Sequence, residues 1–252
     1  MFNFTPEYHE YPFPHIVIRD FITDSGTHDF LRHNQDLVEY FEEMPYSNLE
    51  RIELTMSTKN SGRFTHDLPN DSFDARFNTI VMDVLERLEN SEELDNIIKT
   101  HFVPEFEYEY GKDFTESFSN KTFTYGAYNG CDEAKNLIGW HLDQGDKLVV
   151  GFLYLRERDD IADDGHLYIS TGDDIQKELR YEDNVLILWP NLPNSWHKAG
   201  VRFPTDNLRR IINIVYKTDE KVYHDYRTPR DGTDSNELYS DKKFGFIEVK
   251  KL

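Results

Sequence analysis

The sequence lacks the features that place a protein outside the cell or in a membrane. It contains a single cysteine, Cys131, so no disulfide can form within the chain and no zinc site made of several cysteines is available. No apolar run reaches the roughly 18 residues of a membrane-spanning helix. The opening segment, MFNFTPEYHEYPFPH, has no basic stretch followed by an apolar one, which would mark a secretory signal. We therefore expect an intracellular, cytoplasmic protein without a membrane segment.

Basic residues are scarce beside acidic ones. The chain has 28 Lys and Arg residues against 48 Asp and Glu, which gives a formal net charge of −20 at pH 7. This charge repels a phosphate backbone at long range, so nucleic acid is not expected as the main partner. Hydrophobic residues make up 38% of the 252 residues, enough for a packed core, and this length suits one large domain.

The first part of the chain, up to about residue 120, predicts strand and helix that support a core. The β-branched segment 13–21 predicts a strand. Apolar residues recur at nearly helical spacing over 29–41, and again at three and four residues from 73 to 88. Both stretches predict amphipathic helices that pack on a sheet.

From about residue 121 the pattern changes to short β-rich runs separated by turn signals. The runs cover 122–128, 147–155, 165–170, 184–190 and 209–217. Strands at this spacing indicate a sandwich, a jelly roll or a barrel. The tail from 219 to 252 is charged and has one weak strand at its end, 243–250. Without a repeat or a low-complexity linker, the helices and the β region are expected to be layers of one domain.

A histidine and an aspartate stand two residues apart just before the run 147–155. Ten histidines in a chain with 48 acidic residues produce about two His-x-acid pairs by chance, so the pair alone proves nothing. His141-Leu142-Asp143 is, however, the only His-x-Asp in the chain. In extended backbone, His141 and Asp143 project to the same side and can converge on one ion, while Trp140 and Leu142 face away.

A third metal ligand is available in His197, which follows the run 184–190. Two histidines and one carboxylate form the facial triad of non-haem Fe(II) oxygenases, which leaves three metal positions open. His15 and His166 are the competing histidines. We interpret both as structural, because neither has an aspartate partner.

An arginine pair, Arg209 and Arg210, opens the last β-rich run. Strand alternation puts Arg209 and Asn213 on one face and Arg210 on the other, so one arginine is expected to point inward and the other outward. An inward arginine can pair bidentately with a carboxylate. Two arginines that merely decorate a strand edge remain the alternative.

Together, His141-x-Asp143, His197 and the arginine pair resemble the Fe(II)/2-oxoglutarate-dependent dioxygenases, especially their prolyl-hydroxylase-like branch. Tyr128 and Tyr154 look like the tyrosines with which that family binds its co-substrate, and PFPHIVIRDFI looks like a first strand of many members. The resemblance covers roughly residues 13–45 and 121–217. It implies an α+β, mainly β fold: a double-stranded β-helix, or jelly roll, with N-terminal helices packed on one sheet.

The resemblance also implies the ligands and the reaction. Fe(II) would be held by His141, Asp143 and His197. The 2-oxoglutarate would be held by Arg209, with Arg210 as the alternative, and by Tyr128 and Tyr154, with O2 as the second co-substrate. Because an aspartate rather than a small residue completes the triad, hydroxylation is expected rather than halogenation, with release of succinate and CO2. The implied substrate is a prolyl residue in a peptide or protein, or a free amino acid or similar small molecule.

Two other functions remain open at this stage. A cupin-like metalloenzyme could use the same three ligands without 2-oxoglutarate, and a non-enzymatic jelly-roll domain could carry the triad by chance. Lys147 resembles a position from which some relatives contact substrate, with an exposed strand-edge lysine as the alternative. Tyr125, Trp140 and Trp196 could line a pocket, with packing as the alternative.

Overall fold

The computed structural model describes residues 1–33, 51–57, 60–64, 75–111, 114, 118, 120–128, 140–172, 176–200 and 207–219. For 51–57, 60–64, 75–78 and 128 the description covers the backbone. The later part of the predicted helix 29–41, Cys131, and the tail from 220 with its predicted final strand lie outside these residues.

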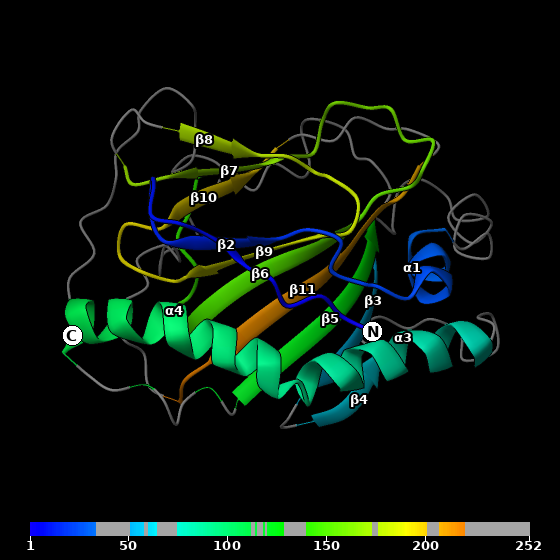
Figure 1. Cartoon of the computed structure of the whole chain (residues 1–252), viewed down its shortest axis with the longest axis horizontal. Coiled ribbons are helices and arrows are strands. Elements are labelled where there is room, and N and C mark those ends of the chain that lie inside the picture. Colours follow the sequence, from blue (N-terminus) through cyan, green and yellow to red (C-terminus); the bar gives the residue numbers. More distant parts are fainter. Residues whose placement is uncertain are drawn as a thin grey trace, which may run out of the picture.

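Two antiparallel sheets make up most of the described fold (Figure 1). The larger sheet has the order β1-β2-β9-β6-β11-β5-β3-β4, and the smaller one has the order β10-β7-β8. The strands are β1 Glu7–His9, β2 His15–Ile18, β3 Arg51–Ser57, β4 Asn60–Phe64, β5 Asn120–Tyr128, β6 Lys147–Leu155, β7 Leu167–Ser170, β8 Gln176–Leu179, β9 Val185–Pro190, β10 Trp196–Ala199 and β11 Arg209–Lys217. The expectation of a mainly β fold is confirmed at this level.

Three helices accompany the sheets in the described residues: α1 Ser25–Arg32, α3 Ala75–Glu89 and α4 Glu92–Tyr110. The Asp24 side chain accepts a hydrogen bond from the backbone N–H of Thr27 at the start of α1, and Ser91 caps α4 in the same way. Gly111 ends α4 with a φ of 63°, a left-handed conformation that glycine adopts without strain. None of these helices is long and apolar enough to cross a membrane.

Several elements were not predicted from the sequence: α4, β1, β3, β4, β8 and β10. The buried residues of α4 do recur every four positions, so a helical signal was present. Pro104 inside the helix counts against a helix prediction, because proline normally disfavours a helix interior. Strands β8 and β10 have four residues each and polar sequences, QKEL and WHKA, which carry little β signal.

The two faces of the large sheet pack against different layers. Residues of its central strands alternate between the two faces: Leu153, Leu186 and Ile212 join one apolar cluster with residues of α3 and α4, whereas Tyr154 and Ile187 join a second cluster with residues of β7 and β8. Helices α3 and α4 run along one side of the sheet, and β10-β7-β8 lies on the other (Figure 1). We call the face of the large sheet that packs against the small sheet the interior face.

Candidate metal centre

The structure brings His141, Asp143 and His197 together. One ligand atom from each lies within 4.8 Å of the others. A bridge between the backbones of His141 and His197 fixes two of them: each N–H donates to the other's carbonyl, at 2.9 and 3.0 Å. The two imidazole rings are 4.2 Å apart between centroids. Three side chains from two separate segments are therefore held as one cluster by backbone pairing.

His197 is oriented by its surroundings on β10. The side chain is buried, and the ring meets the ring of Trp189 edge to face at 5.1 Å. Nδ1 lies 3.1 Å from the carbonyl oxygen of Ser195. Because a carbonyl only accepts, Nδ1 must carry the proton, and Nε2 is left with its lone pair toward the cluster.

The two carboxylate oxygens of Asp143 contact different neighbours. Oδ1 lies 2.5 Å from the ammonium of Lys147, and Oδ2 lies 3.3 Å from Nε2 of His197. Burial alone would raise the pKa of this carboxyl, but the hydrogen bond and charge that His197 supplies when both its ring nitrogens carry protons, and the charge of the Lys147 ammonium, hold it well below its usual range. Asp143 is therefore an ionised carboxylate that could bind a metal, and its Oδ2 lies beside Nε2 of His197.

Lys147 is thus partly buried, and it forms an ion pair with Asp143. Its ion pair with Asp143 spans four residues, and its side chain is 23% exposed. The alternative of an exposed strand-edge lysine is wrong, because the turn before β6 folds the chain back beside the triad. The sequence offered one signal for this contact, the spacing of four residues across a turn.

A second polar group lies on the same interior face. The Arg209 guanidinium carbon is 5.7 Å from the ring centre of Tyr154 and 5.5 Å from that of Tyr181. Burial raises the pKa of the Tyr154 hydroxyl, and the nearby Arg209 guanidinium opposes that rise. Buried atoms here have no hydrogen-bond partner among the described residues: Nε of Arg209, the hydroxyl of Tyr154 and Oδ1 of Asn213. Such atoms cost free energy unless a ligand or water satisfies them.

Arg210 lies on the opposite face of β11. It is fully buried, and its Nη1 donates to the carboxylate of Glu157. The expectation that the second arginine points outward is therefore wrong, because α1 and the segment after β6 cover this face: His33, after α1, lies 3.5 Å from Glu157. Strand alternation correctly separated the two arginines.

The other tyrosine assigned from the sequence, Tyr128, ends β5 with its backbone opposite Arg209. Its side chain lies outside the described residues, so its role stays a prediction. His15 and His166 are not members of the metal cluster. His15 donates from Nδ1 to the Phe13 carbonyl, and Nδ1 of His166 accepts from the backbone N–H of Tyr181.

The remaining aromatic candidates serve packing. Trp140 and Trp196 form a cluster with Leu142 on the outer face of the small sheet, as alternation required of Trp140 and Leu142. Tyr125 lies on the helix side of the large sheet, where its hydroxyl donates to the Leu31 carbonyl at 3.0 Å.

Two aromatic residues of the interior face were not identified from the sequence. Trp189 stands in the predicted strand 184–190, so alternation and its position shortly before His197 could have found it. Tyr181 stands in the loop between β8 and β9, where no periodic pattern exists to point to it.

The donor set fits a particular class of metal. Two imidazole nitrogens and one carboxylate oxygen suit Fe(II) and leave positions open for other ligands. The polar atoms without partners on Arg209 and Tyr154 fit an anionic, hydrogen-bonding ligand on the same face.

No protein-family model matches the chain, and no curated protein matches its sequence. Its structure is similar to that of a full-length Neurospora crassa protein in complex with alpha-KG (2-oxoglutarate) and 5-formyluracil, with a TM-score of 0.52 and 10% identity, over 94% of this chain and 82% of that chain. The complex of the same Neurospora crassa protein with alpha-KG gives a TM-score of 0.50 at 10% identity, over 83% and 75% of the two chains. A Pseudomonas putida prolyl-4-hydroxylase gives 0.47 at 12% identity, over 81% and 92%.

At these identities the likeness concerns the fold. The chain shares the fold of a protein that has been solved with 2-oxoglutarate, and it carries a His-Asp-His triad in which the ligand atoms converge. The resemblance to the Fe(II)/2-oxoglutarate-dependent dioxygenases, expected from the sequence, is confirmed at the level of the fold.

Proposed function

We propose that the protein is an Fe(II)- and 2-oxoglutarate-dependent dioxygenase that hydroxylates an aliphatic C–H bond and releases succinate and CO2. The observation that carries the proposal is that the three candidate metal ligands and the Arg209–Tyr154 group lie at the same face of the large sheet. His141, Asp143 and His197 converge between the two sheets, and Arg209 and Tyr154 present polar atoms without described partners on that same face. A pocket that holds a dicarboxylate between a metal and a cation has this composition.

The residues on this face bind either the metal or the co-substrate in the proposed enzyme. The two imidazoles and Oδ2 of Asp143 hold Fe(II) and leave three positions open. The Arg209 guanidinium pairs with the distal carboxylate of 2-oxoglutarate, and the hydroxyls of Tyr154 and Tyr128 donate to it. When bound, the iron with its co-substrates supplies the oxidising chemistry, which no side chain of the protein can supply.

Neighbouring groups position these ligands. The Ser195 carbonyl fixes the His197 tautomer, so that Nε2 faces the metal. Lys147 holds Oδ1 of Asp143, which leaves Oδ2 for the metal. Trp189 covers one side of the His197 ring and excludes water from it. These contacts reduce the reorganisation that binding of the metal requires.

The sheet topology supports the predicted core. The bridge at His141 places a fourth segment beside β10-β7-β8, and these four face the neighbouring strands β5-β11-β6-β9. We infer a double-stranded β-helix, or jelly roll, of four segments on four. In this proposal residues 1–252 are one catalytic domain, with support up to about 120, the core at about 121–218 and an extension at about 219–252.

The proposed substrate is a prolyl residue in a peptide or protein, or a free amino acid. This choice rests on the sequence resemblance to the prolyl-hydroxylase-like branch. Succinate release across a panel of amino acids and proline-containing peptides tests it. A panel member should raise succinate release above the level measured with 2-oxoglutarate alone.

One spectroscopic experiment tests the reaction class. Anaerobic protein that receives Fe(II) and then 2-oxoglutarate should develop the weak visible charge-transfer band of the chelate. His141→Ala removes a metal ligand and should abolish the band. His101→Ala, which changes a histidine on α4 that stacks on Tyr8, is the control and should keep it. No band in the wild type, or an undiminished band in His141→Ala, contradicts the proposal.

A further inference from the structure

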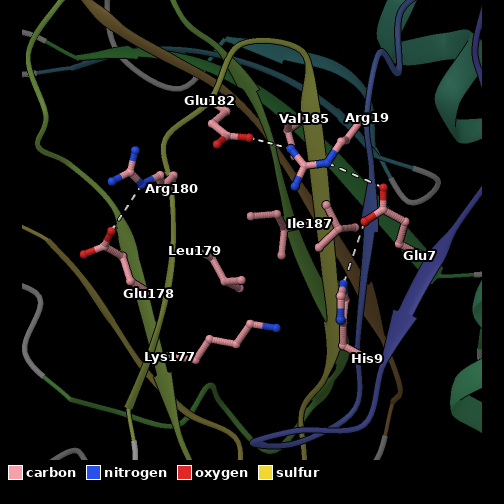
Figure 2. Close-up of a pocket in the computed structure, with 11 residues that line it drawn as sticks. Glu7, His9, Arg19, Lys177, Glu178, Leu179, Arg180, Glu182, Val185 and Ile187 are labelled. Atoms are coloured by element: carbon pink, nitrogen blue, oxygen red, sulfur yellow. Dashed lines mark hydrogen bonds and ion pairs between the residues drawn. The ribbon is translucent and has the colours of Figure 1, made fainter.

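A hollow of about 290 Å³ opens where the free edges of the two sheets face each other (Figure 2). Strand β1 ends the large sheet and β8 ends the small one, and both contribute to its walls. In the small sheet, β7 separates β8 from β10, which carries His197. None of the three metal-ligand candidates lines the hollow, so it is a second cavity and not part of the metal centre.

The floor of the hollow is apolar. Val17, Leu179 and Ile187 line it, and all three belong to the buried cluster between the sheets. In Figure 2 the side chains of Leu179 and Ile187 lie in the middle of the view, and charged groups surround them. An apolar ligand body placed here would remove these side chains from water, which is favourable.

Most charges on the rim are paired with one another. Arg19 contacts Glu182 at 2.5 Å and Glu7 at 3.5 Å, and Arg180 contacts Glu178 at 3.6 Å (Figure 2). Three carboxylates therefore contact the two arginines, and Lys177 brings the rim to three cations against three carboxylates.

Lys177 differs from these residues. In the part of the chain that the structure describes, no carboxylate lies within 4.0 Å of its ammonium, which instead lies 3.0 Å from Nε2 of His15. Nδ1 of His15 donates to the Phe13 carbonyl at 2.8 Å, so Nε2 must be the acceptor for Lys177. Burial lowers the pKa of His15 to about 4, which keeps this imidazole neutral near pH 7.

The result is a cation that a neutral imidazole holds in place and that no described carboxylate contacts. Burial lowers the pKa of the Lys177 ammonium, because its charge is partly removed from water. Of the three ammonium donors, one is used by His15 and the others remain for a ligand. Figure 2 shows the Lys177 side chain extending into the hollow, next to the apolar floor.

We propose that this hollow binds a small carboxylate with an aliphatic body. The carboxylate accepts hydrogen bonds from Lys177, and the aliphatic chain lies on Val17, Leu179 and Ile187. The volume is at the lower limit for ligand pockets, which selects a molecule of a few carbon atoms. Lys177 is the one cation of the rim without a carboxylate within 4.0 Å among the described residues, and one such cation selects one carboxylate rather than two.

The experiment uses hexanoate as the probe and the full chain without added metal. Calorimetry should detect hexanoate binding, and each CH2 added from butyrate to hexanoate should strengthen binding about threefold to fourfold. Hexanamide has a similar shape without the charge and should bind at least tenfold more weakly, because the Lys177 pairing is lost. This comparison needs no variant, so it holds even if a substitution at Lys177 disturbs folding.

Three variants locate the site. Lys177→Met should weaken hexanoate binding at least tenfold. Lys198→Met makes the same change on the outer face of the same sheet, where the lysine lies over the rings of Trp140 and Tyr168, and should leave binding unchanged. Arg209→Met should also leave it unchanged, which separates the hollow from the proposed 2-oxoglutarate site.

Several results would overturn the proposal. These are the absence of hexanoate binding in the wild type, equal affinity for hexanamide, unchanged affinity in a folded Lys177→Met, or a loss of binding in Arg209→Met. Because no metal and no 2-oxoglutarate are present, none of these outcomes depends on the dioxygenase proposal.

Discussion

Each face of β11 carries an arginine and a second polar residue, but the two faces differ in whether carboxylates among the described residues contact them. On the helix side, the charge of Arg210 is paired with Glu157, and the hydroxyl of Tyr216 lies 2.8 Å from a carboxylate oxygen of Asp95. Nε and Nη2 of Arg210 have no hydrogen-bond partner among the described residues, so the two faces differ in how the cation is paired. On the interior side, Arg209 has no carboxylate within 4.0 Å among the residues described, and Oδ1 of Asn213 has no hydrogen-bond partner there. One strand thus has a face on which a carboxylate of the protein pairs with the arginine, and another on which no described carboxylate does.

This difference separates a structural role from a binding role. A buried charge is tolerated when a partner compensates it, so Arg210 and Glu157 are explained by the fold alone. A partly buried cation without a carboxylate partner costs stability, and a protein retains one where a ligand supplies the missing charge. The contrast therefore predicts that substitutions on the helix side change folding, whereas those on the interior side change ligand binding.

The largest effect is expected from Arg210→Met. The substitution leaves the Glu157 carboxylate buried without its cation, and it should lower the free energy of unfolding by about 3–5 kcal/mol. Urea denaturation measures this loss. Adding Glu157→Gln to the same chain removes the uncompensated charge and should recover part of the stability. A cost below about 1 kcal/mol would show that the ion pair is not a structural element of this face.

Arg209→Met is the matched substitution on the interior face. Its stability should change by less than about 1 kcal/mol, because the main contacts of the guanidinium are cation–π contacts with the Tyr154 and Tyr181 rings. Binding of 2-oxoglutarate should weaken by about 2–4 kcal/mol, or roughly 30- to 900-fold, because a charged pair is lost. Titration of 2-oxoglutarate into the metal-loaded protein measures it. Equal binding by the variant and the wild type would contradict the assignment.

How far the sequence predicts this molecule depends on where each strand lies. The runs 147–155 and 209–217 match β6 and β11, and 184–190 matches β9 within one residue. These strands are central and buried on both faces, so they appear as nearly continuous apolar runs. Strand β8 ends its sheet and has polar side chains, so its sequence resembles a loop and only tertiary pairing makes it a strand.

The candidate site shows the same division. His141 and Asp143 could be paired from alternation alone, and alternation also separated Arg209 from Arg210. The contact between Asp143 and Lys147 depends on the geometry of the turn, which a pattern of residue types does not specify. Tyr181 reaches Arg209 from a loop, so only the folded chain brings it there.

A pair of tyrosine substitutions tests the comparison at the level of single hydroxyl groups. Tyr216→Phe removes a hydrogen bond to the charged Asp95 and should cost about 1.5–2 kcal/mol of stability. Tyr154→Phe removes a buried hydroxyl whose polar neighbour is the Arg209 guanidinium and which has no well-formed hydrogen bond among the described residues, so it should cost less stability than Tyr216→Phe. The second variant should instead bind 2-oxoglutarate about fivefold to tenfold more weakly. Equal stability costs in the two variants would remove the distinction between the faces.

The smallest effect is expected from Asn213→Leu. The two side chains have similar volumes, and the substitution removes the carbonyl oxygen that has no partner among the described residues. The ligand-free protein should become more stable by about 0.5–1 kcal/mol, because an unsatisfied buried group is replaced by an apolar one. Thermal unfolding measures this gain in stability. If the Asn213 amide contacts 2-oxoglutarate, the gain should be smaller in the presence of saturating 2-oxoglutarate and a redox-inert metal. A stability loss above about 1 kcal/mol would mean that Asn213 has a structural partner. Asn213 would then belong to the structural residues of β11, as Tyr216 does on the helix side.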